Sequence, residues 1–222
     1  MKKSAFSVLL FVVFILTAFM PDEYKFEPLP TSELDQQVSA INDRFVNMYV
    51  VKNGQNYVVV DAGSDINNIA AELRKLQIDS SKVTAVLLTH SHRDHMAAIG
   101  LFRNATVYVS KAENFSVLGN EQVKLAGDTI FTIGKLTVKA INTPGHTPGS
   151  VSYVIDNTYL FVGDAFSLKN GVVTRPNEKY TKDMPTAVKS FEKIKSLQHL
   201  KYIFTAHTGC SDYFQKAVDT QL

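Results

Sequence analysis

The chain has 222 residues, of which 45% are hydrophobic and 20% charged, and its net charge is +2. This length and composition are ordinary for a folded globular protein with one substantial domain. Lysine and arginine are spread along the chain without a basic block beyond Lys2 and Lys3, so nothing indicates nucleic-acid binding through a charged stripe. The lone cysteine, Cys210, excludes an internal disulfide.

The N-terminal residues differ from the rest of the chain. Two lysines precede an almost unbroken apolar run over residues 5–20, and a polar, proline-rich stretch follows. A basic start, an apolar middle and a polar exit are typical of an export signal. The run is slightly shorter than the ~20 residues that cross a bilayer. We therefore predict that residues 1–20 are a signal peptide or an uncleaved membrane anchor, with a buried core helix as the remaining interpretation.

Either favoured interpretation places the folded part outside the cytoplasmic membrane of a bacterium, secreted or tethered by the N-terminal segment. Residues 21–36 are predicted to be a linker, and residues 37–222 are predicted to form the domain itself.

Strand patterns dominate from residue 37. Asn53 and Gly54, between two apolar segments, predict a hairpin. Ser64 or Asp65 is a good N-cap for a helix that ends near Leu76. Strands are predicted over residues 45–52, 56–60, 83–88, 106–110, 129–141 (as two segments), 151–155, 158–162 and 201–205. Further helices are predicted near residues 96–102, over residues 185–197 and at the C-terminus.

Histidine and aspartate recur directly after predicted strands. The stretch from Leu87 to His95 holds three of the six histidines of the chain, and later strands are followed by His146, Asp164 and His207. Strand ends can converge on one edge of a sheet, where functional groups gather in mixed α/β folds. The candidate metal ligands are His90, His92, Asp94, His95, His146, Asp164 and His207.

These residue types suit a metal-dependent hydrolase. Histidine nitrogen and aspartate oxygen are the ligands of catalytic zinc sites. In an extended turn His90 and His92 can share one metal, whereas Asp94 and His95 can serve a second. His146 and His207 are free to complete the two shells, and Asp164 can bridge. Two cations about 3.5–4 Å apart hold a hydroxide and polarise the bond that it attacks, so no serine or cysteine nucleophile is required.

Three other residues have simpler interpretations. His199 is expected at the surface or at a helix end. Asp61 can cap a helix or orient a ligand histidine, and the sequence leaves both roles open. Cys210 is expected to be a buried, inert thiol.

Five motifs resemble those of the metallo-beta-lactamase fold superfamily. THSHRDH resembles its His-x-His-x-Asp-His signature, and the preceding VVVDAG resembles its Asp-x-Gly strand end. TPGHTPGS, LFVGDAF and TAHTG resemble its later ligand motifs in the same order. The match runs from about Phe45 to Gly209. The resemblance implies an α/β fold, a four-layer αββα sandwich in which two mixed β-sheets are flanked by helices.

The resemblance also implies a dinuclear zinc site, with iron or manganese as other possible metals. It assigns His90, His92 and His146 to one metal. It assigns Asp94, His95 and His207 to the other, with Asp164 bridging. Asp94 is implied to be catalytic as well, because it orients the nucleophile.

Asp164 makes the chain resemble glyoxalase II-like hydrolases more than true beta-lactamases. True beta-lactamases of this fold are expected to carry a non-bridging residue at that position. We therefore expect cleavage of an ester, thioester or lactone of a small molecule. The alternatives are a mononuclear iron persulfide dioxygenase, a beta-lactam hydrolase and a non-catalytic metal-binding module. No nucleic-acid partner is expected, and a membrane is expected to be contacted only through the N-terminal segment. Pocket walls are expected from the loop after Asp61 and from residues 111–128 and 165–184. The last segment contains Phe166, Lys169, Arg175, Lys179 and Tyr180, and a cationic or phenolic group there can hold an anionic substrate or stabilise an oxyanion.

Overall fold

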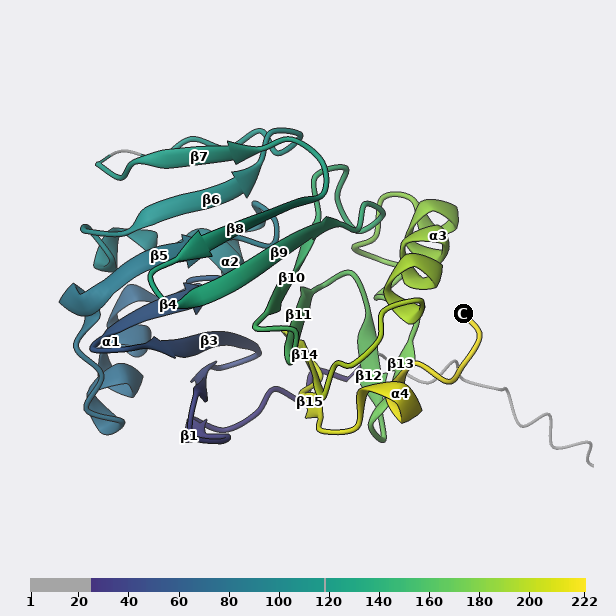
Figure 1. Cartoon of the computed structure of the whole chain (residues 1–222), viewed down its shortest axis with the longest axis horizontal. Helices are drawn as coiled ribbons and strands as arrows, with labels where there is room; N and C mark the ends of the chain where they lie inside the picture. The colour runs from purple at the N-terminus through teal and green to yellow at the C-terminus, as the bar shows by residue number, and fades with distance from the viewer. Residues whose placement is uncertain (1–24, 118) are drawn as a thin grey trace, which may run out of the picture.

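Two mixed β-sheets lie face to face in the computed structural model, which describes residues 25–117 and 119–222 (Figure 1). The first sheet has the order β1-β2-β3-β4-β5-β6-β7, and its last three pairings are parallel. Its strands are β1 (Ser32–Glu33), β2 (Val38–Asp43), β3 (Val46–Asn53), β4 (Asn56–Val60), β5 (Val83–Leu87), β6 (Thr106–Ser110) and β7 (Gln122–Leu125).

The second sheet has the order β15-β14-β11-β10-β9-β8, and only the β11–β14 pairing in it is parallel. Its strands are β8 (Thr129–Ile133), β9 (Leu136–Asn142), β10 (Val151–Ile155), β11 (Tyr159–Gly163), β14 (Tyr202–Thr205) and β15 (Cys210–Ser211). A separate hairpin is formed by β12 (Ser167–Lys169) and β13 (Val172–Thr174).

Helices cover the outer faces of the two sheets. The α-helices are α1 (Ile66–Lys75), α2 (Arg93–Met96), α3 (Met184–Lys195) and α4 (Phe214–Ala217), and the 3-10 turns are η1 (Ser80–Lys82) and η2 (Ile99–Leu101). Figure 1 places α1 beside the first sheet and α3 and α4 on the opposite side, beside the second. The expected four-layer αββα sandwich of two mixed sheets is therefore confirmed.

Three apolar clusters correspond to the three interfaces between these layers. The first joins the two sheets, the second joins the first sheet to α1, and the third joins the second sheet to α3 and α4. Strand β3 contributes to two of these clusters: Tyr49 and Val51 belong to the first, whereas Met48 and Val50 belong to the second. Side chains alternate along a strand, so a strand buried on both faces is apolar throughout.

Two buried tyrosines connect the sheets close to the strand ends. The Tyr49 hydroxyl donates to the Thr205 carbonyl at 2.7 Å, and the Tyr153 hydroxyl donates to the Leu88 carbonyl at 3.0 Å. Leu88 and Thr205 each come two residues before a candidate ligand histidine. These bonds therefore fix the relative position of the two sheets where the candidate site begins.

Several short strands were not predicted from the sequence. Strand β7 lies within residues 111–128, and β12 and β13 lie within residues 165–184, two segments that were expected to form pocket walls and to which no strand was assigned. These strands have three or four residues each, so their pairing depends on neighbouring strands and not on a local apolar pattern.

The N-terminal part of the chain is described only from residue 25. The predicted signal peptide or anchor lies outside the described residues. From residue 25 the segment expected to be a linker lies on the domain, because β1 pairs with β2 and the Glu27 amide donates to the His207 carbonyl at 2.7 Å. Within the described part of the chain, no helix is long and apolar enough to cross a bilayer.

Candidate metal centre

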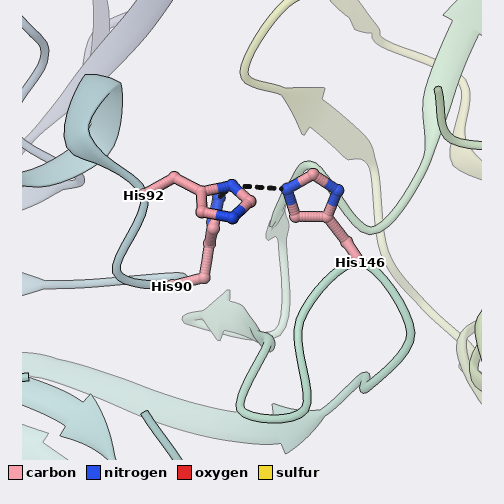
Figure 2. Close-up of side chains that lie close together, drawn as sticks. All are labelled: His90, His92 and His146. Atoms are coloured by element: carbon pink, nitrogen blue, oxygen red, sulfur yellow. Dashed lines mark hydrogen bonds between the residues drawn. The ribbon is translucent and has the colours of Figure 1, made fainter. Parts of the chain in front are cut away.

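Three histidines from two loops converge in the first half of the candidate site. His90 and His92 follow β5, and His146 lies between β9 and β10. Nδ1 of His92 lies 3.0 Å from Nε2 of His90 and 2.9 Å from Nε2 of His146. Figure 2 shows His146 opposite His90 and His92, with the shorter contact dashed. The ring planes of His92 and His146 are 79° apart, an edge-on arrangement. The backbone at His92 is extended, so His90 and His92 point the same way, as the sequence predicts.

A second group forms beside it from Asp94, His95 and His207, whose ligand atoms lie within 4.8 Å of one another. Asp94 and His95 lie in α2, which begins directly after His92, and His207 follows β14. Oδ2 of Asp94 lies 3.4 Å from Nε2 of His207 and 3.6 Å from Nε2 of His95. The strand ends thus bring together side chains that are more than a hundred residues apart in the sequence.

Asp164 lies between the two groups. Its Oδ2 is 3.5 Å from Nε2 of His146 and 3.2 Å from Nε2 of His207, and its Oδ1 is 3.3 Å from Nε2 of His95. The preceding Gly163 has φ +56°, and a Cβ there would lie 2.4 Å from Oγ1 of Thr89. Only glycine therefore lets β11 approach the first sheet closely enough to bring Asp164 into the site.

Groups behind the ligands fix two of the rings. Oδ2 of Asp61 lies 2.8 Å from Nδ1 of His95, and the other oxygen of Asp61 accepts from the Thr89 amide at 2.8 Å. Nδ1 of His207 lies 2.6 Å from the Phe45 carbonyl. Each contact turns Nε2 of the same ring toward the carboxylates. The structure thus places Asp61 behind a histidine, while Asp65 caps α1 by accepting from two amides.

A further buried carboxylate, Glu113, had no signal in the sequence. It accepts hydrogen bonds from the Ser91 amide at 3.1 Å, from the Ser91 hydroxyl and from the Thr147 hydroxyl. Ser91 lies between His90 and His92, and Thr147 follows His146. Glu113 therefore ties together the two loops that carry the three-histidine group. Its place in a polar segment without a motif explains why sequence reasoning missed it.

The two halves of the site differ in the protonation that they favour. Burial lowers the pKa of His146 to about 4, and it lowers the pKa of His90 and His92 as well. Burial alone would also lower the pKa of His207, but the negative charge of Asp164 raises it to about 9. The pKa of His95 is raised well above its ordinary value in the same way. The three-histidine group is thus neutral at pH 7.

The residues fit a metal centre. Neutral imidazoles offer lone pairs to a metal. Nδ1 of His92 lies 2.9–3.0 Å from Nε2 of His90 and of His146, so the three nitrogens converge as the ligands of a tetrahedral zinc ion must. Among the described residues, Nε2 of His95 and Oδ1 of Asp164 are buried atoms without a hydrogen-bond partner. Buried polar atoms are normally paired, so a cation bound here would satisfy both of these atoms, which lie 3.3 Å apart. Of the residues that the structure describes, neither His199 nor Cys210 belongs to a group of potential metal ligands.

The site opens into a pocket of about 570 Å³. Its lining includes Phe26, Phe45, His92, Arg93, Asp94, His146, Asp164, Asn177, Tyr180 and His207. Tyr180 was expected there. Phe166, in the same segment, does not line the pocket: its side chain is 1% exposed and packs on Phe191 in the third apolar cluster. Phe26 and Phe45 were not predicted, because neither lies in a recognisable pattern.

Comparisons with known proteins agree with this geometry. The family model of the metallo-beta-lactamase superfamily matches residues 41–207. A protein named "probable metallo-hydrolase" from Methanocaldococcus jannaschii is 36% identical over 155 residues, which cover 68% of this chain and 71% of that protein. A hydroxyacylglutathione hydrolase from Glaesserella parasuis is 30% identical over 179 residues, covering 77% of this chain and 68% of that protein.

Among solved structures, a B3 metallo-beta-lactamase with an active-site glutamic acid superimposes with a TM-score of 0.66. The match covers 87% of this chain and 88% of that one at 17% identity. At this level of identity the likeness shows the fold.

Proposed function

The chain belongs to the metallo-beta-lactamase superfamily, and on this premise we propose that it is a two-zinc hydrolase of a small ester, thioester or lactone. In this proposal one zinc ion is held by His90, His92 and His146. The residues of the second are Asp94, His95 and His207, with Asp164 shared. The similarity to a hydroxyacylglutathione hydrolase supports an acyl-transfer reaction of this kind.

The position of Asp164 is the observation that carries the proposal. Its two oxygens lie 3.2–3.5 Å from ring nitrogens of both halves, so one carboxylate can serve two cations. Burial alone would raise the pKa of this carboxyl, but the charges of His207 and His95 hold it well below its usual range. Asp164 therefore carries a full negative charge at neutral pH and favours cations on either side.

When bound, two zinc ions supply an acidified water and a polarising charge for the scissile carbonyl. The chain supplies orientation. Asp94 is the more exposed of the two site carboxylates and lines the pocket. Burial opposes ionisation of Asp94, but its contact with His207 keeps the pKa of the carboxyl below its ordinary value. Asp94 is thus an acceptor at neutral pH, able to orient the attacking water and take its proton.

A hydrolysis panel tests this proposal. The panel contains thioesters, lactones, phosphodiesters and a chromogenic beta-lactam, each assayed with and without added zinc. We expect zinc-dependent cleavage of thioesters, esters or lactones. Asp94→Asn should lower kcat by about 100-fold or more, because it removes the base. His199→Asn, at an exposed turn, is the matched control and should retain full activity. Cleavage of only the beta-lactam would contradict the proposed substrate class.

We also propose that the domain works outside the cytoplasmic membrane. Support comes from the basic start and the apolar run over residues 5–20. Fractionation of cells that express the full chain tests this proposal, and recovery of the chain in the cytoplasm alone would contradict it.

A further inference from the structure

The pocket beside the metal centre has an aromatic wall built from segments outside the ligand loops. Phe26 precedes β1, Phe45 lies in the turn between β2 and β3, and Tyr180 precedes α3. Building on the proposed function, we infer that the substrate carries a bulky apolar group, aromatic or long aliphatic, close to its scissile carbonyl. Phe26 is the residue that determines this preference.

Exposure of these rings is the first support. Phe26 and Phe45 are each 40% exposed and Tyr180 is 48% exposed. In the described part of the chain only six large hydrophobic side chains are exposed, and these three line one pocket. Apolar side chains scattered singly over a surface need no explanation, whereas a group of them around a cavity is typical of a ligand site.

The rings also lie directly beside a candidate metal ligand. The centroid of Phe26 is 4.9 Å from that of His207, and the Phe45 ring stacks on His207 with centroids 6.0 Å apart and an interplanar angle of 8°. Phe26 and Phe45 also contact each other, at 5.8 Å. A substrate whose carbonyl reaches the metals would therefore place its neighbouring carbons against these rings.

The segment that carries Phe26 is firmly held. The Glu27 amide donates to the His207 carbonyl at 2.7 Å, and the Leu29 amide donates to Oδ1 of Asn47 at 2.8 Å. The amide groups of Asn42 and Asn47 both donate to the Leu29 carbonyl at 2.9 Å. Asn47 is buried, so it anchors residues 25–31 to the first sheet. Phe26 thus has a fixed position, and its ring is a preorganised surface for an apolar group.

The other residues that line the pocket explain why the aromatic rings would determine which substrates bind. Apart from the candidate ligands, the polar groups that line the pocket are the side chains of Arg93 and Asn177 and the Tyr180 hydroxyl. Burial of apolar surface contributes roughly 25 cal/mol per Å², so a phenyl group covered by the rings should bind about tenfold more tightly than a methyl group.

Two kinetic series on the zinc-loaded full chain test the inference. One varies the acyl group (acetyl, hexanoyl, phenylacetyl) on a constant thiol, and the other varies the thiol on a constant acetyl group. The series that shows the preference identifies the side of the substrate that meets the rings. We expect kcat/KM to rise about tenfold with apolar size in one series.

The variants separate binding from folding. Phe26→Ala should reduce that preference about fivefold, and Phe26→Leu should keep most of it, because leucine retains an apolar side chain. Tyr213→Ala removes another exposed aromatic ring, which lies outside this pocket, and should leave the preference unchanged. The thermal midpoint of Phe26→Ala should match that of the parent protein. No preference in either series, or an unchanged preference in Phe26→Ala, overturns the inference.

A binding measurement distinguishes failure of this inference from failure of the proposed function. Calorimetry compares phenylacetate with acetate, and benzyl alcohol with methanol, on the zinc-loaded chain. If no ester or thioester is hydrolysed, the proposed function fails and binding alone decides. Tighter binding of an aromatic ligand that is weakened by Phe26→Ala supports the inference, and equal binding within both pairs overturns it.

Discussion

Oδ2 of Asp61 lies 2.8 Å from Nδ1 of His95, and both side chains are buried. This contact fixes the ring so that Nε2 points at the carboxylates of the site. Asp61 itself has a positive φ of 60° and is held by the Thr89 amide and hydroxyl. A buried carboxylate in this position fixes the tautomer of a ligand histidine and raises its basicity.

Asp61→Asn should therefore weaken zinc binding by the half that contains His95. We expect a loss of about 10- to 100-fold in affinity, because the amide accepts more weakly and can turn a donor toward Nδ1. Zinc competition with a coloured chelator measures this. Asp65→Asn is the matched control, since asparagine caps a helix as well as aspartate. Unchanged affinity in Asp61→Asn would show that the contact does not position the ring.

Glu113→Ala should instead weaken zinc binding by the three-histidine half of the site. The substitution leaves the half-buried Ser91 hydroxyl and the buried Thr147 hydroxyl without this acceptor, at a cost of roughly 1–3 kcal/mol for the buried group. We expect a lower zinc affinity of the three-histidine half, together with a lower thermal midpoint. Glu113→Gln keeps an acceptor and should recover part of both. Glu121→Gln, near the exposed end of β6, is the control. Equal zinc affinities in Glu113→Ala and the parent would contradict this role.

Tyr153→Phe should lower stability while leaving the metal centre intact. The hydroxyl donates to the Leu88 carbonyl inside the sandwich, and burial raises the pKa of the phenol well above its ordinary value, so it remains a donor. Loss of the donor leaves a buried carbonyl unpaired and should reduce the free energy of unfolding by about 1–2 kcal/mol. Urea unfolding measures the change, with Tyr213→Phe as an exposed control. A midpoint equal to that of the parent would contradict the proposed contribution.

Zinc binding by the two halves should depend on pH in different ways. In the metal-free protein His207, with a pKa of about 9, holds a proton at pH 7, and zinc must displace it. As pH falls from 9 to 6, zinc affinity of this half should fall by up to about tenfold per unit for each proton displaced. His146, with a pKa of about 4, stays neutral over this range, so its half should keep its affinity.

Dialysis against a fixed free zinc concentration at pH 6 and pH 9 measures this difference. We expect two zinc ions per chain at pH 9 and about one at pH 6. Loss of both ions together as pH falls would contradict the assignment of the two halves.

The ligand residues could be predicted from the sequence because each follows a strand whose pattern is local. Asp164 and His207 come directly after apolar runs, whereas His146 lies in the turn that follows β9, and parallel or adjacent strands bring such positions to one edge. The role of Asp61 was left open because its chain neighbours allow a helix cap equally well. Only the packing of β4 against β5 brings it next to His95.

The pocket could not be predicted in the same way. Phe26 reaches the site because Asn47, a buried residue of β3, holds the segment before β1. Glu113 reaches Ser91 and Thr147 through a turn after β6 with no motif of its own. Phe166 lies in a segment that was expected to form a pocket wall, but its side chain belongs to the third apolar cluster. Each of these positions depends on contacts between distant segments, which local patterns do not encode.

The metal content of the purified full chain, measured together with its hydrolytic activity, tests the two-zinc hydrolase most directly. We predict two zinc ions per chain, loss of thioester or lactone hydrolysis on chelation, and recovery on return of zinc but not of magnesium. One iron ion per chain with oxygen uptake on a persulfide would contradict this function, as would full zinc occupancy without hydrolysis.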